Sequence, residues 1–236
     1  MTITRNFSIL AEGASSAGVL AVANGGSGYS TGVPVSTRQV LTSGTTYTTP
    51  ANVRQLKIRM VGGGGGGAGT SSTGRPAGSS GGASSFNSIT AVGGAGGYVA
   101  GGNNTTPGTG SASFRVPGAP GGGLIGNTNT GAPLTTLSVG GNGGQGPFGG
   151  GSIGGVATGA GGNAPANSGA GGGGAANGTG SIVGAGGQAG EYVELIINSP
   201  SATYTYAIGT SGAGGTGGTE NGGNGGTGLI IVDEFY

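Results

Sequence analysis

The chain has 236 residues, of which 67 are glycine, and only 6% of its residues are charged. Its formal net charge of +1, with Lys57 as the single lysine, argues against a nucleic-acid partner, because phosphate binding draws on many basic side chains. Histidine and cysteine are absent, which excludes disulfides, thiolate metal sites and the commonest general base.

Residues 1–37 are expected to form an attachment segment and linker. The N-terminal sequence MTITRNFSILAEGASS has no continuous apolar core, so it predicts no secretory signal. No run in the chain approaches the ~20 apolar residues that a membrane-spanning helix needs, so no membrane insertion is expected. Gly and Ser residues between Asn24 and Gly32 mark turns or a linker. The folded domain is therefore expected to span residues 38–236.

Strand patterns occur near both ends of this domain. The first strand is predicted by apolar residues that alternate with polar ones, at Leu56, Ile58 and Met60. Two later strands follow the same rule, with Val193, Leu195 and Ile197 on one face of the first and Tyr204, Tyr206 and Ile208 on one face of the second. Residues 229–232 are apolar at every position, as expected of a central strand covered on both sides. The sequence thus predicts a mainly β fold, with a small β-sandwich-like base formed from both ends of the chain.

The region from about residue 62 to 187 reads as a glycine-rich insertion into this base. Glycine loses the most entropy on ordering, so an ordered glycine-rich segment needs a specific compensation. Polyproline II geometry can provide this compensation, because it has three residues per turn and no internal hydrogen bonds, so its backbone groups are free to bond to neighbouring segments. A GGx repeat then leaves two faces of each helix free of side chains, and neighbouring helices can satisfy each other's backbone groups there. The predicted outward residues x are Asn142, Thr216, Thr219, Asn224 and Thr227.

We therefore expect packed polyglycine II helices, and the two competing interpretations are collagen and a flexible linker. Collagen is excluded, because the repeats are short, interrupted and nearly free of proline. A flexible linker, the usual state of Gly/Ser-rich chains, remains the alternative.

The sequence offers little catalytic chemistry, and we expect neither an enzyme nor a cofactor or metal site. The acidic residues are Glu12, Glu191, Glu194, Glu220, Asp233 and Glu234. Two carboxylates could in principle cleave a glycosidic bond. Pairing with Lys57 and Arg59 across an exposed sheet face is the favoured interpretation. Matches to GxGxxG arise by chance in so glycine-rich a chain, and no phosphate-binding GxxxxGK[ST] motif occurs.

Recognition through loops is the remaining kind of function. The insertion contains segments unlike the glycine repeats, and these hold its few large side chains. Loops on a rigid scaffold usually carry binding, and Tyr and Arg are typical anchors. The candidate binding residues are Arg75, Tyr98, Arg115 and Phe148. For Phe148, as for Phe114, a place in a small local core is the alternative.

Several blocks resemble the glycine-rich domain at the tips of bacteriophage tail fibres. These are VRQLKIRMVGGGGGGAG, AGEYVELII, TYTYAIGTSGAGG and GGNGGTGLIIVDEFY, which lie in their usual order at the two ends of residues 39–236. The interior is similar to the distal adhesins of T-even-like phages, in which layers of polyglycine II helices carry variable receptor-binding loops. Because those loops vary freely, the resemblance transfers no individual contact residue.

The resemblance implies a virion protein at an exposed surface or tail-fibre tip that binds a host surface protein or glycan. Residues 1–37 would attach it to another fibre, baseplate or capsid protein, since no long shaft precedes the domain. A homotrimer is expected, with a monomer on a trimeric fibre as the alternative. Two other functions stay open: a structural decoration or fibre protein of the capsid or baseplate, and an ice-binding protein, which the apolar strands disfavour.

Overall fold

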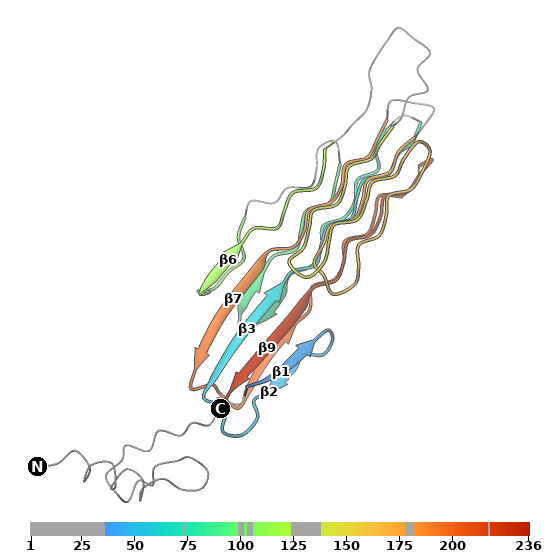
Figure 1. Cartoon of the computed structure of the whole chain (residues 1–236). Coiled ribbons are helices and arrows are strands. Elements are labelled where there is room, and N and C mark those ends of the chain that lie inside the picture. The colour runs from blue at the N-terminus through green and yellow to red at the C-terminus, as the bar shows by residue number, and fades with distance from the viewer. Residues whose placement is uncertain are drawn as a thin grey trace, which may run out of the picture. The chain divides into compact units, whose positions relative to one another are not determined.

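The computed structural model in Figure 1 describes residues 36–72, 74–98, 102, 106–123, 138–177, 182–216 and 218–236. Residues 37–235 form one compact unit, and the predicted attachment segment lies almost wholly outside the described residues. The described part of the chain contains strands and no helix. The strands are β1 (Ser36–Leu41), β2 (Thr46–Thr48), β3 (Gln55–Val61), β4 (Ser84–Phe86), β5 (Ile89–Ala91), β6 (Phe114–Val116), β7 (Tyr192–Asn198), β8 (Thr203–Ala207) and β9 (Leu229–Phe235).

The strands form two sheets. The larger sheet has the order β1-β9-β3-β7-β6, and β3 pairs antiparallel with both β7 and β9, with Ile58 opposite Leu195 and Val232. The smaller sheet has the order β2-β8-β4-β5, joined by antiparallel pairs such as Tyr47 with Tyr204. Strands from both ends of the chain therefore lie side by side, which confirms the expected mainly β fold.

A single apolar core lies between the two sheets. The larger sheet contributes the alternating residues of β3, β7 and β9, and the smaller sheet contributes mainly aromatic rings. The rings of Phe86 and Tyr204 lie 5.2 Å apart, and those of Phe86 and Tyr47 lie 5.8 Å apart. A second, smaller cluster on the opposite face of the larger sheet joins Val61, Leu229 and Ile231. Strand β9 is thus covered on both faces, as its continuous apolar sequence predicts.

Three short strands lie inside the predicted glycine-rich insertion, where no strand was expected from the sequence. Strands β4 and β5 form a hairpin whose two turn residues, Asn87 and Ser88, have positive φ angles of 49° and 65°. This hairpin places the fully buried Phe86 in the core. Strand β6 pairs with β7 and forms one edge of the larger sheet. These strands gave no pattern in the sequence because each has only three residues.

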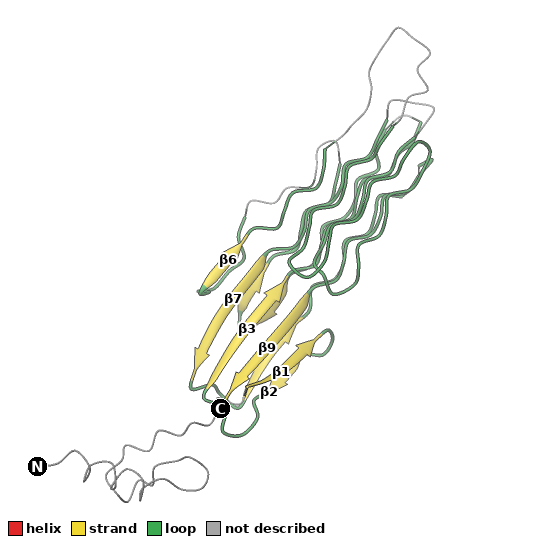
Figure 2. Cartoon of the chain, in the orientation of Figure 1, coloured by secondary structure: helices red, strands yellow, loops and turns green. Residues whose placement is uncertain are grey.

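Glycine-rich segments continue beyond the ends of the strands as extended runs (Figure 2). Residues 62–70, which follow β3, show how these runs are held. Gly62, Gly65 and Ala68 donate backbone hydrogen bonds to Glu191, Gln188 and Ala185 in turn. The residues between them donate to two other segments, 76–82 and 220–226, again at every third position. Consecutive N–H groups therefore point to three different neighbours, and the pattern repeats every three residues.

Residues 62–70 also accept backbone hydrogen bonds from three further segments, 92–97, 172–175 and 212–215. Extended backbone thus surrounds this run on all sides. Residues 168–176 and 183–191 bond to it and to each other, and all three runs are buried at every position. Because the backbones approach so closely, a Cβ on Gly67 would lie 2.0 Å from the carbonyl oxygen of Gly173. Only glycine fits at such a position.

Outer segments carry larger residues at the positions that face solvent. Among the predicted outward residues, Asn142, Thr216, Thr219 and Asn224 are exposed and Thr227 is half-buried. Several of these side chains replace a missing neighbour by accepting a backbone N–H. Asn142 accepts from Gly154 at 2.9 Å, and Asn224 accepts from Gly214 at 2.8 Å. Asparagine at these positions therefore terminates the hydrogen-bonded array at its edge.

Candidate functional site

Among the described residues, the turns at the ends of the glycine-rich runs away from the sheets form a candidate site, here called the distal end. Residues 62–70 leave β3 and end at Thr70, which pairs with Glu220. A tight turn follows, in which Ser71 N–H donates to the carbonyl oxygen of Gly74 at 2.9 Å and Gly74 N–H donates to Ser71 Oγ at 2.9 Å. A second described turn joins Val156 to Gly159 and places Ala157 at a φ of 56°. Both turns are therefore fixed by the hydrogen-bonded runs beneath them.

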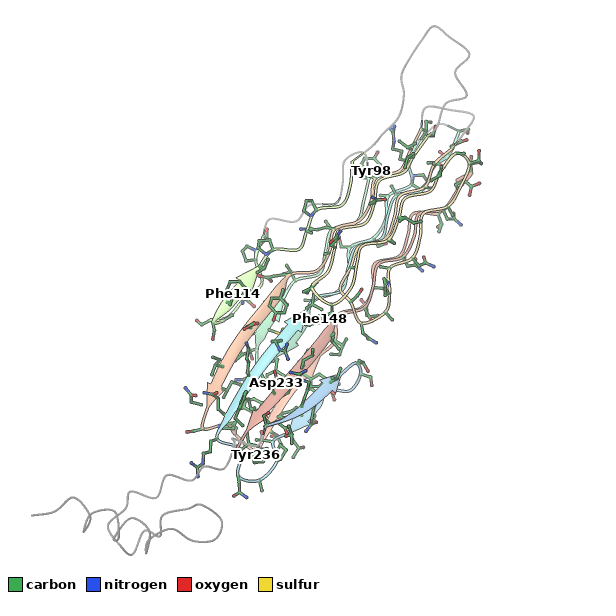
Figure 3. The ribbon with its side chains drawn as sticks, viewed as in Figure 1. Tyr98, Phe114, Phe148, Asp233 and Tyr236 are labelled. Atoms are coloured by element: carbon green, nitrogen blue, oxygen red, sulfur yellow. The ribbon has the colours of Figure 1, made fainter. Side chains whose placement is uncertain are left out.

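Two of the four predicted binding residues lie toward this end. Arg75 directly follows the first turn, and its Nε donates to the carbonyl oxygen of Val183 at 2.7 Å. Tyr98 is 56% exposed at the end of the run 92–97, and Figure 3 shows it far from the sheets. Two residues that were not predicted, Ile153 and Val156, are 74% and 53% exposed near the second turn. Their signal in the sequence is a large aliphatic residue within a run of Gly, Ala and Ser.

The other two predicted residues lie beside the sheets. Phe148 is half-buried against Val61, Leu229 and Ile231. The ring centroids of Phe148 and Tyr192 lie 5.9 Å apart in an edge-to-face arrangement. The local-core interpretation of Phe148 therefore describes its position. The structure does not bring the four predicted residues together in one site.

Arg115 points inward from β6 and joins three separate segments. Its guanidinium donates to Glu191 Oε1 at 3.0 Å and to the carbonyl oxygens of Thr90, Thr109 and Gly110, each at 2.8 Å. The Glu191 side chain is only 3% exposed. Its second oxygen accepts the N–H groups of Val92 at 3.0 Å and Gly108 at 2.9 Å. This buried ion pair fixes the loop 106–110 against the base of the glycine-rich array.

The outer face of the larger sheet carries a row of ion pairs. Lys57 Nζ lies 2.9 Å from Glu194, and Arg59 lies 2.7 Å from Asp233, as expected from the sequence. Arg38 also contacts Asp233, at 2.5 Å. The hydroxyl of Tyr192 donates to Glu194 at 2.5 Å. That hydrogen bond and the nearby Lys57 lower the pKa of Glu194, whereas burial and the neighbouring carboxylate raise the pKa of Tyr192.

Glu234, which lies at the end of β9, is buried between the sheets rather than on this face. It accepts hydrogen bonds from Tyr47 at 2.6 Å and Gln39 at 2.7 Å, and from Thr37. The four carboxylates of β7, β9 and the residue before β7 are therefore all engaged within the fold. Ion pairs and hydrogen bonds within the fold are therefore sufficient to explain where these four carboxylates lie.

Within the described residues there is no group of three metal-ligating side chains and no helix long and apolar enough to cross a membrane. The sequence matches no protein-family model and no curated protein.

Proposed function

We propose that this protein is a bacteriophage adhesin, located at a tail-fibre tip or another exposed surface of the virion. It contacts the host cell through the turns at the distal end of packed polyglycine II helices. The observation that carries this proposal is the arrangement of the glycine-rich runs. They are fixed at one end by the sheets, and toward the other end they carry exposed side chains, such as Tyr98 at the end of the run 92–97 and Val156 beside a short turn.

The polyglycine II assignment rests on the hydrogen bonds. Polyglycine II has three residues per turn, so successive N–H groups point in three directions and must find three neighbours. The run 62–70 donates to three different segments with this period, and none of its hydrogen bonds lies within the run itself. The flexible-linker interpretation has no explanation for such a pattern, because a disordered chain keeps no fixed partners.

Rigid support explains why the distal turns suit recognition. A turn that is already ordered loses little conformational entropy when it binds, so more of the contact energy appears as affinity. Side chains on such turns can also change with little effect on the array beneath, since they make few contacts with it. An adhesin that meets variable hosts needs both properties.

The remaining parts of the proposal concern assembly. Residues 1–37 attach the domain to another fibre, baseplate or capsid protein, and the protein acts as a homotrimer or as a monomer on a trimeric fibre. Chemical cross-linking of the purified protein separates these two states, because a monomer band alone excludes the homotrimer.

A competition assay tests the adhesin role. Purified protein is added to host cells before the phage that carries it, and free phage is counted after adsorption. We expect a dose-dependent loss of adsorption, which Tyr98→Ala weakens and the half-buried Phe148→Leu leaves intact. Protein that folds but neither binds cells nor blocks adsorption contradicts the proposal, and the structural decoration role then replaces it.

A further inference from the structure

A groove of about 330 Å³ lies beside β6, where the glycine-rich runs meet the larger sheet. This volume falls at the lower end of the range for small-molecule sites. The groove is mostly apolar, and none of its lining residues is charged. Its larger side chains come from Phe114, Val116, Pro117, Gln145, Pro147 and Tyr192.

The aromatic part of the groove is exposed on a strand whose backbone is paired with β7. Phe114 is 54% exposed and Val116 is 41% exposed, although both belong to a strand. Val116 lies opposite Tyr192 in the β6–β7 pair, and the Tyr192 ring rests against Phe148. Figure 3 shows Phe114 on β6, at the edge of the sheet. Because the strand already fixes its backbone, this ring has only two side-chain torsions to lose when a ligand stacks on it.

Polar groups stand on both sides of this apolar surface. Gln145 is exposed, and its side-chain amide can both donate and accept a hydrogen bond. Glu194 is the cross-strand partner of Phe114, and its carboxylate is oriented by Tyr192 and Lys57. Lys57 forms an ion pair with Glu194, and Arg59 lies opposite Glu194 in the β3–β7 pair, so the carboxylate beside the groove is compensated. The groove therefore combines an exposed ring, an exposed amide and an uncharged lining.

We propose that this groove binds a neutral saccharide, with one sugar ring stacked on Phe114 and its hydroxyl groups bonded to Gln145. A sugar ring has an apolar C–H face and an edge of hydroxyl groups, which matches the two kinds of surface found here. Charged ligands are disfavoured because the lining offers them no opposite charge. A purely apolar ligand would leave the Gln145 amide without a partner.

A proline-rich peptide is the competing ligand, since aromatic grooves also recognise polyproline II segments. The exposed amide and the neighbouring oriented carboxylate favour the sugar, which has a hydroxyl group for each. The proposal does not depend on the adhesin role, because the groove lies next to the sheets and the distal turns lie at the other end of the glycine-rich runs.

The test is NMR titration of the full chain. The probes are the methyl glycosides of glucose, galactose, mannose and N-acetylglucosamine, and a proline-rich decapeptide. We expect at least one glycoside to shift the resonances of Phe114, Val116 and Gln145 in a saturable way. Phe114→Ala should weaken that binding about three- to tenfold, as the loss of one stacking contact implies, and Gln145→Ala should weaken it as well. Val40→Ala should change nothing, because Val40 is 56% exposed on β1, at the other edge of the larger sheet and outside the groove.

Three results would overturn the proposal. The first is that no glycoside shifts the groove resonances. The second is that glycosides shift them but Phe114→Ala and Gln145→Ala bind as wild type does. The third is that the peptide alone shifts them. Since both tested residues are exposed, matching melting temperatures confirm that the variants remain folded.

Discussion

Replacing Gly143 by Val tests whether the glycine-rich runs are packed as described. Gly143 lies in an outer run that contacts the buried run 168–176. A Cβ at this position would lie 1.9 Å from the carbonyl oxygen of Gly171 and 2.4 Å from its carbonyl carbon. Real Cβ atoms essentially never approach another atom within 3.0 Å, so the two runs must separate by about 1 Å.

That separation acts on specific hydrogen bonds. Gly171 N–H donates to Gly144 and Gly174 N–H donates to Gly141, both at 2.8 Å. An opening of about 1 Å takes both distances past the limit for a hydrogen bond. Counting about 1–3 kcal/mol for each of the two broken hydrogen bonds gives a loss of about 2–6 kcal/mol in the free energy of unfolding. For a domain of this size, the melting temperature should fall by about 5–20 °C.

Gly150→Val is the matched control, because a Cβ on Gly150 has no atom within 4 Å. This variant makes the same chemical change in a neighbouring outer run, and we expect an effect of about 0.5 kcal/mol or less. Thermal unfolding followed by circular dichroism measures both variants against wild type. Equal melting temperatures for Gly143→Val and Gly150→Val would refute the packing argument.

Three further predictions concern side chains. Asn142→Thr looks neutral from the sequence, because both residues are polar and position 142 faces outward. In the structure, however, Asn142 accepts the N–H of Gly154, so we expect the free energy of unfolding, measured by chemical denaturation, to fall by about 1 kcal/mol. No change would mean that water replaces the amide. Arg115→Ala leaves the buried Glu191 carboxylate without its cation and should lower the free energy of unfolding by about 3 kcal/mol or more. The double variant with Glu191→Gln should recover part of this stability, and no recovery would contradict a charge effect. Glu194→Gln tests pH dependence. Because the folded state lowers the pKa of Glu194, its stabilising effect is present above the usual value of 4.5 and is lost as the pH falls below it. The melting temperatures of wild type and Glu194→Gln should therefore differ at pH 7, and the difference should shrink as the pH falls below 4.5. A difference of constant size across this pH range would contradict the prediction.

The strands could be predicted from the sequence where their side chains alternate over several residues. Strands β3, β7 and β8 show this pattern, because one face of each meets the core and the other does not. The hairpin of β4 and β5 carries no such signal, since three residues are too few to establish a period. Its Phe86 stands alone in a region of Gly and Ser, although it belongs to the core.

The burial of particular glycine-rich runs also has a signal in the sequence. The run GGGGGGAGT at 62–70 has no large residue at any of its three faces, whereas GGNGGQG at 140–146 has one at every third position. A run enclosed on all sides by backbone needs three small faces, and an outer run needs only two. The contrast separates these two runs but does not extend to 183–191, which is buried although it contains Val183, Gln188 and Glu191.

The interaction partners of Arg115 could not be predicted from the sequence. Its partner Glu191 lies 76 residues away, and the pairing depends on β6 joining the edge of β7. Composition indicated only that Arg115 is one of the few large side chains in a glycine-rich region. Whether such a residue contacts a ligand or stabilises a fold depends on tertiary geometry, and here its four hydrogen bonds are all internal.

The three-residue hydrogen-bond period restricts how the lengths of these segments can change during evolution. Inserting one residue into 62–70 would turn every later N–H toward a different neighbour, so that Ala68 would no longer face Ala185. Inserting three residues keeps each N–H on its own neighbour and, with the proposed polyglycine II geometry, lengthens the run by about 9 Å. Related domains should therefore differ by whole triplets within the buried runs and by any number of residues in the distal turns. The spacing of insertions among homologues would then distinguish framework from variable surface.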